Sequence, residues 1–176
     1  MKARRIISAV ALMLVTACLL TGCGVTVPRP KVKEAKFDFS VTYEMNGEMD
    51  TIRGALVCQY AGTSWTIDGG TFTRDWVGHV EGVEAGSGYK VQLSTTEDGG
   101  KIFLALGLSP AYFMGETYML DFYTPEPGLF IEYSNEADDM ATVTSDEEMI
   151  AEVYGIRIIS YEYDEPIENS FSVFNF

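Results

Sequence analysis

A short acidic segment late in the sequence has the residue types that calcium prefers. Asn135, Glu136, Asp138 and Asp139 offer four oxygen-bearing side chains within five residues, and no Lys or Arg occurs over residues 102–156. Calcium binds through several hard oxygen ligands and needs no histidine. The spaced D-x-[DN]-x-[DN]-G pattern of an EF-hand loop is absent here. An acidic loop exposed to water is therefore the simpler interpretation, and a calcium site is the alternative.

Three aromatic residues have the types that recur in sugar-binding surfaces, namely Trp65, Trp76 and Tyr89. Trp and Tyr combine a flat apolar face with a polar group. The three together could form a stacking platform similar to those of many carbohydrate-binding modules. All three also lie in strand-like segments, where the same side chains would fill a core. Burial in the core is favoured, and the platform is the alternative.

Cys58 and His79 are the candidates for nucleophilic chemistry. Cys58 lies in an apolar, strand-like run, where a free cysteine behaves as a small buried hydrophobe. A nucleophile paired with His79, the only histidine, would need further placed groups that no motif indicates. The patterns G-x-S-x-G, G-x-x-x-x-G-K, H-E-x-x-H and C-x-x-C are also absent. We therefore expect no enzymatic activity. A glycan hydrolase that uses Asp and Glu as acid and base is the alternative.

The elements that must position these residues begin with a clear β-strand pattern. Over residues 37–45 apolar and polar side chains alternate, which is typical of a strand with one buried face. The pair Asn46-Gly47 follows, and it is the strongest short hairpin signal because both central positions of a type I′ turn need positive φ. A return strand is expected over residues 48–60, with a bend or bulge at Gly54.

Further short strands, separated by Gly-rich and Pro-rich turns, fill the rest of the chain. They are expected over residues 64–68, 75–81, 89–95, 101–106, 117–123, 129–133, 156–163 and 170–176. Many short strands at this spacing predict a mainly β fold, an antiparallel β-sandwich, with a closed β-barrel as the alternative. Residues 37–176 are expected to form one domain, because no repeat or second linker interrupts them. The last strand carries aromatic residues on both faces, so we expect it to be buried.

Two interruptions of the strand pattern carry helix signals. Ser109 before Pro110 is a typical N-cap and first-turn pair, which predicts one helical turn. Ser145 followed by Glu148 forms a capping box and predicts a short helix over residues 146–154. A strand that continues directly into the next one is the alternative for this second segment.

The charge of the chain excludes one class of partner. The sequence has 12 Lys and Arg against 26 Asp and Glu, and residues 37–176 contain 5 basic and 25 acidic residues, a net charge of −20. Binding to DNA or RNA needs clustered basic residues that neutralise phosphates, so we expect no nucleic-acid partner. The same charge attracts a cationic partner, while solubility alone is the simplest explanation. Protein and glycan partners stay open.

The first 22 residues have the layout of an export signal. Basic residues at positions 2, 4 and 5 precede an apolar run over residues 6–20. This run is shorter than the roughly 20 residues that a membrane-spanning helix needs. A cleaved signal is therefore favoured over a permanent transmembrane anchor.

The apolar run closes on Leu20, Thr21, Gly22 and Cys23. This order of charge, apolar run and Leu-small-small-Cys resembles the lipobox of bacterial lipoprotein signal peptides. The resemblance covers residues 1–23 and implies cleavage before Cys23, a diacylglycerol on its thiol, and anchoring at the extracytoplasmic face of a bacterial membrane. Residues 1–22 are then the signal peptide, and residues 23–36 are interpreted as the lipidated cysteine and a flexible tether.

Together these patterns predict a membrane-anchored, extracytoplasmic lipoprotein whose β domain binds or scaffolds a partner without catalysis. A β-barrel that carries a small ligand is the alternative, followed by the carboxylate-based glycan hydrolase. No cofactor is expected apart from the calcium alternative at the acidic segment.

Overall fold

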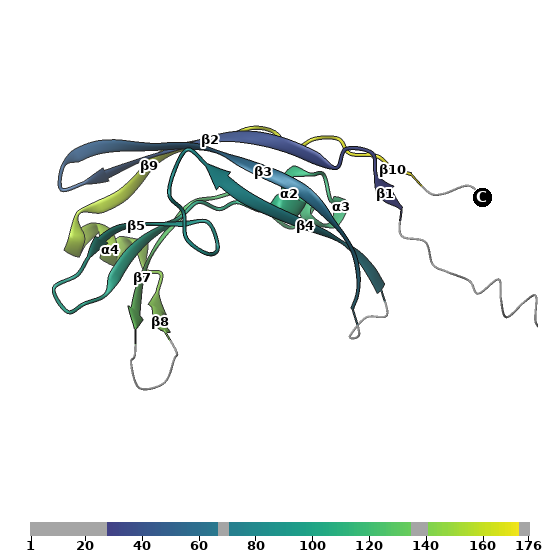
Figure 1. Cartoon of the computed structure of the whole chain (residues 1–176). Helices are drawn as coiled ribbons and strands as arrows, with labels where there is room; N and C mark the ends of the chain where they lie inside the picture. Colours follow the sequence, from purple (N-terminus) through teal and green to yellow (C-terminus); the bar gives the residue numbers. More distant parts are fainter. Residues whose placement is uncertain (1–27, 67–70, 135–140, 173–176) are drawn as a thin grey trace, which may run out of the picture.

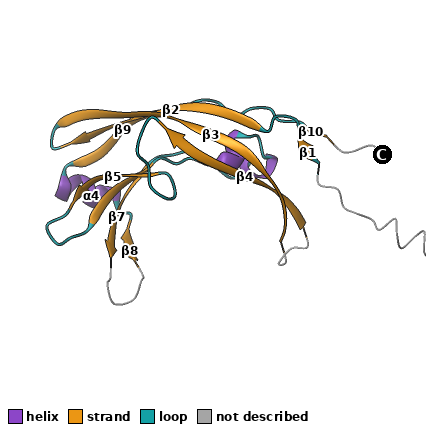
Figure 2. Ribbon diagram, in the orientation of Figure 1, coloured by secondary structure: helices purple, strands orange, loops and turns teal. Residues whose placement is uncertain are grey.

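The computed structural model describes residues 28–66, 71–134 and 141–172. These residues form two antiparallel four-stranded sheets, a two-stranded ribbon and three short helices (Figures 1 and 2). The strand order is β4-β3-β2-β9 in the first sheet and β5-β6-β7-β8 in the second, and the ribbon pairs β1 with β10. The elements are β1 (Arg29–Pro30), β2 (Glu34–Met45), β3 (Glu48–Thr66), β4 (Thr71–Glu81), β5 (Lys90–Thr95), β6 (Lys101–Ala105), α2 (Pro110–Phe113), α3 (Thr117–Leu120), β7 (Gly128–Ser134), β8 (Ala141–Thr144), α4 (Glu147–Tyr154), β9 (Ile156–Tyr163) and β10 (Phe171–Ser172).

The two sheets form the predicted β-sandwich. Figure 1 shows the long, curved first sheet lying over the second sheet at one end and over α2 and α3 at the other. Neither sheet closes on itself within the described residues, because β4 and β9 are the edges of the first sheet and β5 and β8 are the edges of the second. The alternative of a closed β-barrel is therefore wrong.

Side chains from the inner faces of both sheets form the core. Every second residue of β2 from Phe37 to Tyr43 is at most 6% exposed, which agrees with the alternating pattern. Phe113 of α2 and Ile150 of α4 are at most 1% exposed and join this core. The second sheet contributes Ile102, Leu104, Leu129 and Ile131. Burial of this apolar surface provides the main driving force for folding.

The hairpin between β2 and β3 follows its local signal. Asn46 and Gly47 have φ values of +54° and +83°. Met45 pairs with Glu48 across the turn. These values match the positive φ that a two-residue type I′ turn requires, so the predicted hairpin is confirmed.

β3 is one long strand where two were predicted. Its register against β4 shifts between Tyr60 and Gly62. This β-bulge lets the strand continue across residues 61–63, where the sequence pattern predicts a gap between two strands. The bulge expected at Gly54 is absent from the β2–β3 register, which is continuous there. Gly54 is needed for space, because a Cβ atom at this position would lie 2.6 Å from the carbonyl oxygen of Glu81.

Two of the helices begin near the predicted residues. The hydroxyl of Ser109 accepts a hydrogen bond from the backbone N–H of Tyr112, which confirms it as the N-cap of α2. α4 is also confirmed, but its N-cap is Asp146, whose Oδ1 accepts from the backbone N–H of Met149 at 2.9 Å. The capping box predicted at Ser145 is therefore wrong by one residue, because the Asp carboxylate is the group that caps the helix.

Residues 117–123, predicted as a strand, contain α3 instead. Glu116 caps this helix, and its backbone carbonyl accepts from the N–H groups of Met119 and Leu120. The side chain of Glu116 is buried and bound to Arg74 of β4. Because strand propensity depends on such tertiary context, the local pattern of apolar residues did not reveal the helix.

The C-terminal strand and β8 also differ from the expectation. β8 was not predicted, and it pairs with β7 at the edge of the second sheet. Of the strand predicted over residues 170–176, Phe171 and Ser172 pair with β1. Residues 173–176 lie outside the described part of the chain.

Regular structure begins before the predicted boundary at residue 37, since β1 and the start of β2 precede it. Between these strands the backbone N–H of Val32 donates to Asn169 Oδ1 at 3.2 Å, and Asn169 Nδ2 donates to the carbonyl of Val32 at 2.9 Å. The backbone N–H of Tyr60 donates to the carbonyl of Lys33 at 2.8 Å. Residues 28–36, interpreted from sequence as part of a flexible tether, are therefore held by the sheet and by the C-terminal segment.

Candidate functional site

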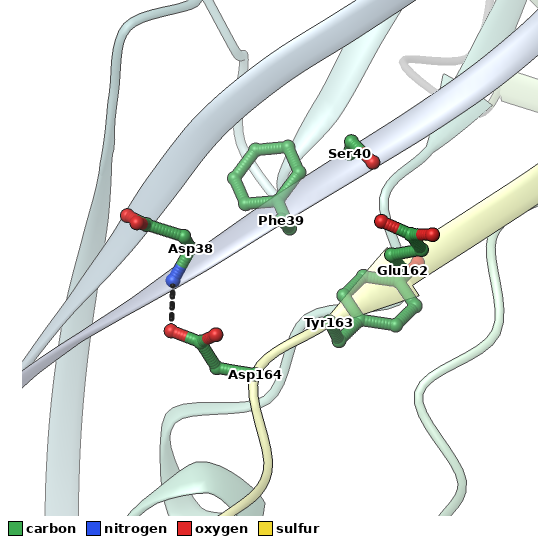
Figure 3. A pocket seen from close by; sticks show the side chains of 6 residues that line it. All are labelled: Asp38, Phe39, Ser40, Glu162, Tyr163 and Asp164. Carbon is green, nitrogen blue, oxygen red and sulfur yellow. Dashed lines mark hydrogen bonds between the residues drawn. The ribbon is translucent and has the colours of Figure 1, made fainter.

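An open depression of about 440 Å³ lies where β2 and β9 pair (Figure 3). Its lining residues are Asp38, Phe39, Ser40, Glu162, Tyr163 and Asp164. The three acidic residues are exposed, and Ser40 adds a hydroxyl group. We treat this depression as the candidate functional site because it concentrates accessible hydrogen-bond acceptors.

Strand pairing brings two distant segments together at the depression. Ser40 of β2 pairs with Glu162 of β9, so polar side chains of both strands lie on the outer face of the sheet. Asp164 follows the end of β9, and its Oδ2 accepts from the backbone N–H of Asp38 at 2.7 Å. The backbone N–H of Asp164 donates to the carbonyl of Asp38 at 3.0 Å. Asp164 therefore fixes the chain where it leaves the sheet.

Phe39 and Tyr163 supply the apolar part of the lining. Phe39 is only 5% exposed. The hydroxyl of Tyr163 donates to the carbonyl of Leu106 at 2.8 Å. Burial raises the pKa of Tyr163, and neighbouring ionisable groups raise this pKa further. Tyr163 is therefore protonated and already hydrogen-bonded at neutral pH, so its role is structural.

Two basic residues border the depression on the outer face of the first sheet. Arg53 lies opposite Ser40 in the β2–β3 register. Lys36 lies two residues before Asp38 on the same face of β2, and its Nζ donates to Glu81 Oε2 at 2.8 Å. This hydrogen bond raises the pKa of Lys36 and lowers the pKa of Glu81. Lys36 is therefore committed to Glu81, and the acidic side of the depression is the side formed by β9.

The depression has the chemistry of a cation-binding surface. The carboxylates of Asp38, Glu162 and Asp164 can accept charge-assisted hydrogen bonds from an ammonium or guanidinium group. The six lining residues include no thiol, imidazole or amine. Across residues 28–66, 71–134 and 141–172, no group of three His, Cys, Asp or Glu residues is placed to hold a metal ion. The site therefore suits organic cations better than metals.

Cys58 and His79 lie on opposite faces of the first sheet. Cys58 pairs with Gly78, and Val57 pairs with His79, so the thiol points inward and the imidazole points outward. Cys58 is fully buried, and burial raises the pKa of its thiol to about 12. The Nε2 atom of His79 lies 3.7 Å from Glu81 Oε1 at the surface. The two residues do not form a dyad, and Cys58 is a core side chain.

Two residues of the predicted sugar platform lie on the inner side of the first sheet. The indole N–H of Trp76 donates to Glu116 Oε1 at 2.8 Å, and its ring meets Tyr60 edge-on with 5.5 Å between centroids. The hydroxyl of Tyr89 donates to the carbonyl of Gly78 at 3.2 Å. Trp76 and Tyr89 are half-buried and packed against the core, which favours the core interpretation.

The other predicted residues lie outside the described part of the structure. They are the side chain of Trp65, the calcium candidates Asn135, Glu136, Asp138 and Asp139, and the segment Leu20, Thr21, Gly22 and Cys23. The calcium site and the lipidated cysteine stay predictions. None of the described helices is long and apolar enough to cross a membrane, and the apolar run over residues 6–20 is not among the described residues.

A buried ion pair at the opposite edge of the sheet, on β4, was missed by the sequence analysis. Arg74 Nε donates to Glu116 Oε1 at 2.5 Å, and Arg74 Nη2 donates to Glu116 Oε2 at 2.7 Å. The side chains are 17% and 1% exposed, respectively. The guanidinium also lies 3.7 Å from the ring centroid of Phe171, and Nη1 donates to the carbonyl of Pro28 at 3.4 Å. No spacing in the sequence relates these residues, which come from four separate segments.

No protein-family model matches the chain, and no curated protein or solved structure matches it significantly. Its function is therefore inferred from its own residues and their arrangement.

Proposed function

We propose that the protein is a lipid-anchored, extracytoplasmic binding protein that acts without catalysis. The observation that carries this proposal is Leu20-Thr21-Gly22-Cys23 at the end of an apolar run preceded by basic residues. Acyl chains on Cys23 would provide the anchor. Two or three chains suffice for stable anchoring, since each buried CH₂ contributes about 0.8 kcal/mol.

The domain would bind a cationic group at the depression between β2 and β9. Support comes from the exposed carboxylates of Asp38 in β2, Glu162 in the adjacent β9, and Asp164 directly after β9. The net charge of −20 over residues 37–176 would attract a basic ligand from a distance. Surface binding is preferred over a carrier function, because the carrier alternative depended on a closed barrel and the two sheets do not form one.

Native mass spectrometry of the full-length protein, extracted from its own membrane in mild detergent, tests the anchor. We expect the mass of diacylglycerol, with or without a further acyl chain, on a chain that begins at Cys23. A Cys23→Ser variant is the control and should lack this mass. An unmodified chain would contradict the lipoprotein proposal. A co-purifying small molecule would identify the ligand directly.

Calorimetric titration with a tetralysine peptide tests the depression. Glu162→Gln should weaken binding several-fold, because it removes one of the three carboxylates while keeping a side chain of the same size. Glu165→Gln is the matched control, since Glu165 is an exposed acid that does not line the depression. Binding should also weaken at high salt. Equal affinities for the parent protein and both variants would contradict binding at this site.

A further inference from the structure

Exposed apolar side chains lie at the end of α3. Phe122 is 89% exposed, and Leu120 is 43% exposed. Scattered apolar side chains are normal on protein surfaces. Phe122 is nevertheless the most exposed large apolar side chain in the described part of the chain, and it lies only two residues from Leu120. Apolar residues of this kind insert into the boundary between lipid headgroups and acyl chains.

The buried ion pair places α3 beside the point where the N-terminal segment enters the domain. Arg74 binds the carboxylate of Glu116, the N-cap of α3, and the same guanidinium donates to the carbonyl of Pro28. The ring of Phe171 in β10 lies against Arg74. Figure 1 shows α3, β1 and β10 at the same end of the molecule, away from α4.

The distance from this point to the lipid anchor is short. Only residues 24–27 separate Cys23 from Pro28. A fully extended chain spans at most about 3.6 Å per residue, so Cys23 lies within about 18 Å of Pro28. A tether that extended to residue 36 would have allowed more than twice this distance. A lipidated Cys23 would therefore keep the α3 end close to the membrane surface.

Charge favours the same orientation. Arg29, Lys31 and Lys33 are exposed in the first described residues, whereas the remainder of the chain from residue 37 is strongly acidic. Anionic headgroups attract exposed basic residues and repel an acidic surface. Asp121, between Leu120 and Phe122, opposes this attraction locally.

Val32, beside the basic residues of the first described segment, is 39% exposed. We propose that the membrane-proximal face, defined as the apolar residues Val32, Leu120 and Phe122 and the basic residues Arg29, Lys31 and Lys33, docks on the lipid surface that holds the anchor. This inference rests on the lipid anchor of the proposed function. Because the anchor already confines the domain near the bilayer, a weak interfacial contact is enough to orient it. The depression between β2 and β9 then belongs to a domain of fixed orientation.

A spin label at position 124 tests the docking in the lipidated full-length protein. The protein is reconstituted into vesicles of phosphatidylcholine and phosphatidylglycerol, and Thr124→Cys places the label two residues from Phe122 without removing it. Ser145→Cys, just before α4, is the matched control, since both positions are exposed and neutral. Cys58 is buried, and Cys23 carries the lipid, so the introduced cysteine is the one that is labelled.

Docking predicts that the label at position 124 is several-fold less accessible to a water-soluble nickel relaxant than the label at position 145, and more accessible to oxygen, which concentrates in lipid. Adding Phe122→Ser should return the label at position 124 to the accessibility seen at position 145. This substitution should not unfold the protein, because Phe122 is exposed. Removing phosphatidylglycerol should reduce the protection.

Three outcomes overturn the inference. Equal accessibility at both positions, with acyl mass confirmed on Cys23, would leave the lipoprotein proposal intact and refute docking. Protection from both nickel and oxygen would show that a protein surface, such as a second copy of the chain, covers this face. A protein without acyl mass that does not remain with the vesicles would refute the lipid anchor and the docking together.

Discussion

Carboxylates have opposite environments at the two edges of the first sheet. At β4 and α3, the carboxylate of Glu116 is buried and receives hydrogen bonds from Arg74 and Trp76. At β2 and β9, the carboxylates of Glu162 and its neighbours line an open depression and belong to exposed residues. Figure 3 shows the hydrogen bond that the backbone N–H of Asp38 donates to the carboxylate of Asp164.

This difference separates a structural carboxylate from carboxylates that are available to a ligand. A buried charge that loses its partner costs several kcal/mol, so the carboxylate of Glu116 has to stay paired with Arg74, and its burial closes it to a ligand. An exposed carboxylate keeps its hydration and exchanges water for a ligand at little cost. Substitutions at the β4 edge should therefore change stability, and substitutions at the β9 edge should change binding.

The largest effect is expected for Glu116→Gln. This change leaves the guanidinium of Arg74 without its partner charge inside the protein and should lower the free energy of unfolding by about 3 kcal/mol or more. Urea unfolding measures it. Glu44→Gln is the control, because Glu44 binds Arg157 at the surface and should cost less than about 1 kcal/mol. Equal losses for the two variants would remove the contrast between a buried and an exposed carboxylate.

A smaller loss of stability is expected for Trp76→Phe. The substitution keeps an aromatic ring but removes the N–H that donates to Glu116, while both bonds from Arg74 remain. The loss should be about 1.5 kcal/mol, the usual contribution of a hydrogen bond to a charged group. Tyr161→Phe at the surface should change stability by less than about 0.5 kcal/mol. If Trp76→Phe changed stability as little as Tyr161→Phe, the hydrogen bond from Trp76 to Glu116 would contribute nothing to the free energy of unfolding.

The contrast between buried and exposed groups also predicts how slowly the buried thiol of Cys58 reacts. Burial raises the pKa of its thiol from the ordinary 9.0 to about 12. Because the folded state favours the protonated thiol, this stabilisation is complete below about pH 9 and is lost as the pH rises toward 12. At pH 8 a thiol reagent should react slowly with Cys58 in the folded protein and rapidly in urea. The exposed thiol of Thr124→Cys should react rapidly throughout, and rapid reaction of Cys58 in the folded protein would contradict its burial.

The smallest change in stability is expected for Asp164→Asn in the depression. The Asn carbonyl can still accept from the backbone of Asp38, so the free energy of unfolding should change by less than about 0.5 kcal/mol. Affinity for tetralysine should nevertheless fall several-fold, as for Glu162→Gln, because a negative charge is lost. Asp164→Ala, which also removes the acceptor, should cost about 1 kcal/mol. Unchanged affinity in Asp164→Asn would show that the depression does not bind cations.

Local elements of the fold could be predicted because their causes lie within a few residues. Asn46 and Gly47 provide the positive φ values of their turn, and the start of α2 follows from Ser109. α3 could not be predicted in this way, because its N-cap residue Glu116 makes no side-chain cap hydrogen bond and its carboxylate is instead held by Arg74, 42 residues away. The mistaken strand over residues 117–123 reflects that missing long-range contact.

The candidate site was hidden from the sequence for a related reason. Asp38 and Ser40 could be assigned to the polar face of a strand, but alternation does not state which strand pairs with it. Ser40 meets Glu162 only because β9, which follows all four strands of the second sheet in the sequence, pairs with β2. With 26 acidic residues in the chain, nothing distinguished these three beforehand.

The sequence by itself determined the acidic character, the mainly β fold and the location of local turns, because these depend on composition and on short-range steric preferences. It also contains the export-type segment that ends at Cys23, on which the proposed anchor rests. Only the tertiary structure decided that Glu116 is buried against Arg74, that the carboxylates near Glu162 share a depression, and that α3 lies beside Pro28. These relations arise from the pairing of strands and the packing of layers, which bring together residues that no local pattern connects.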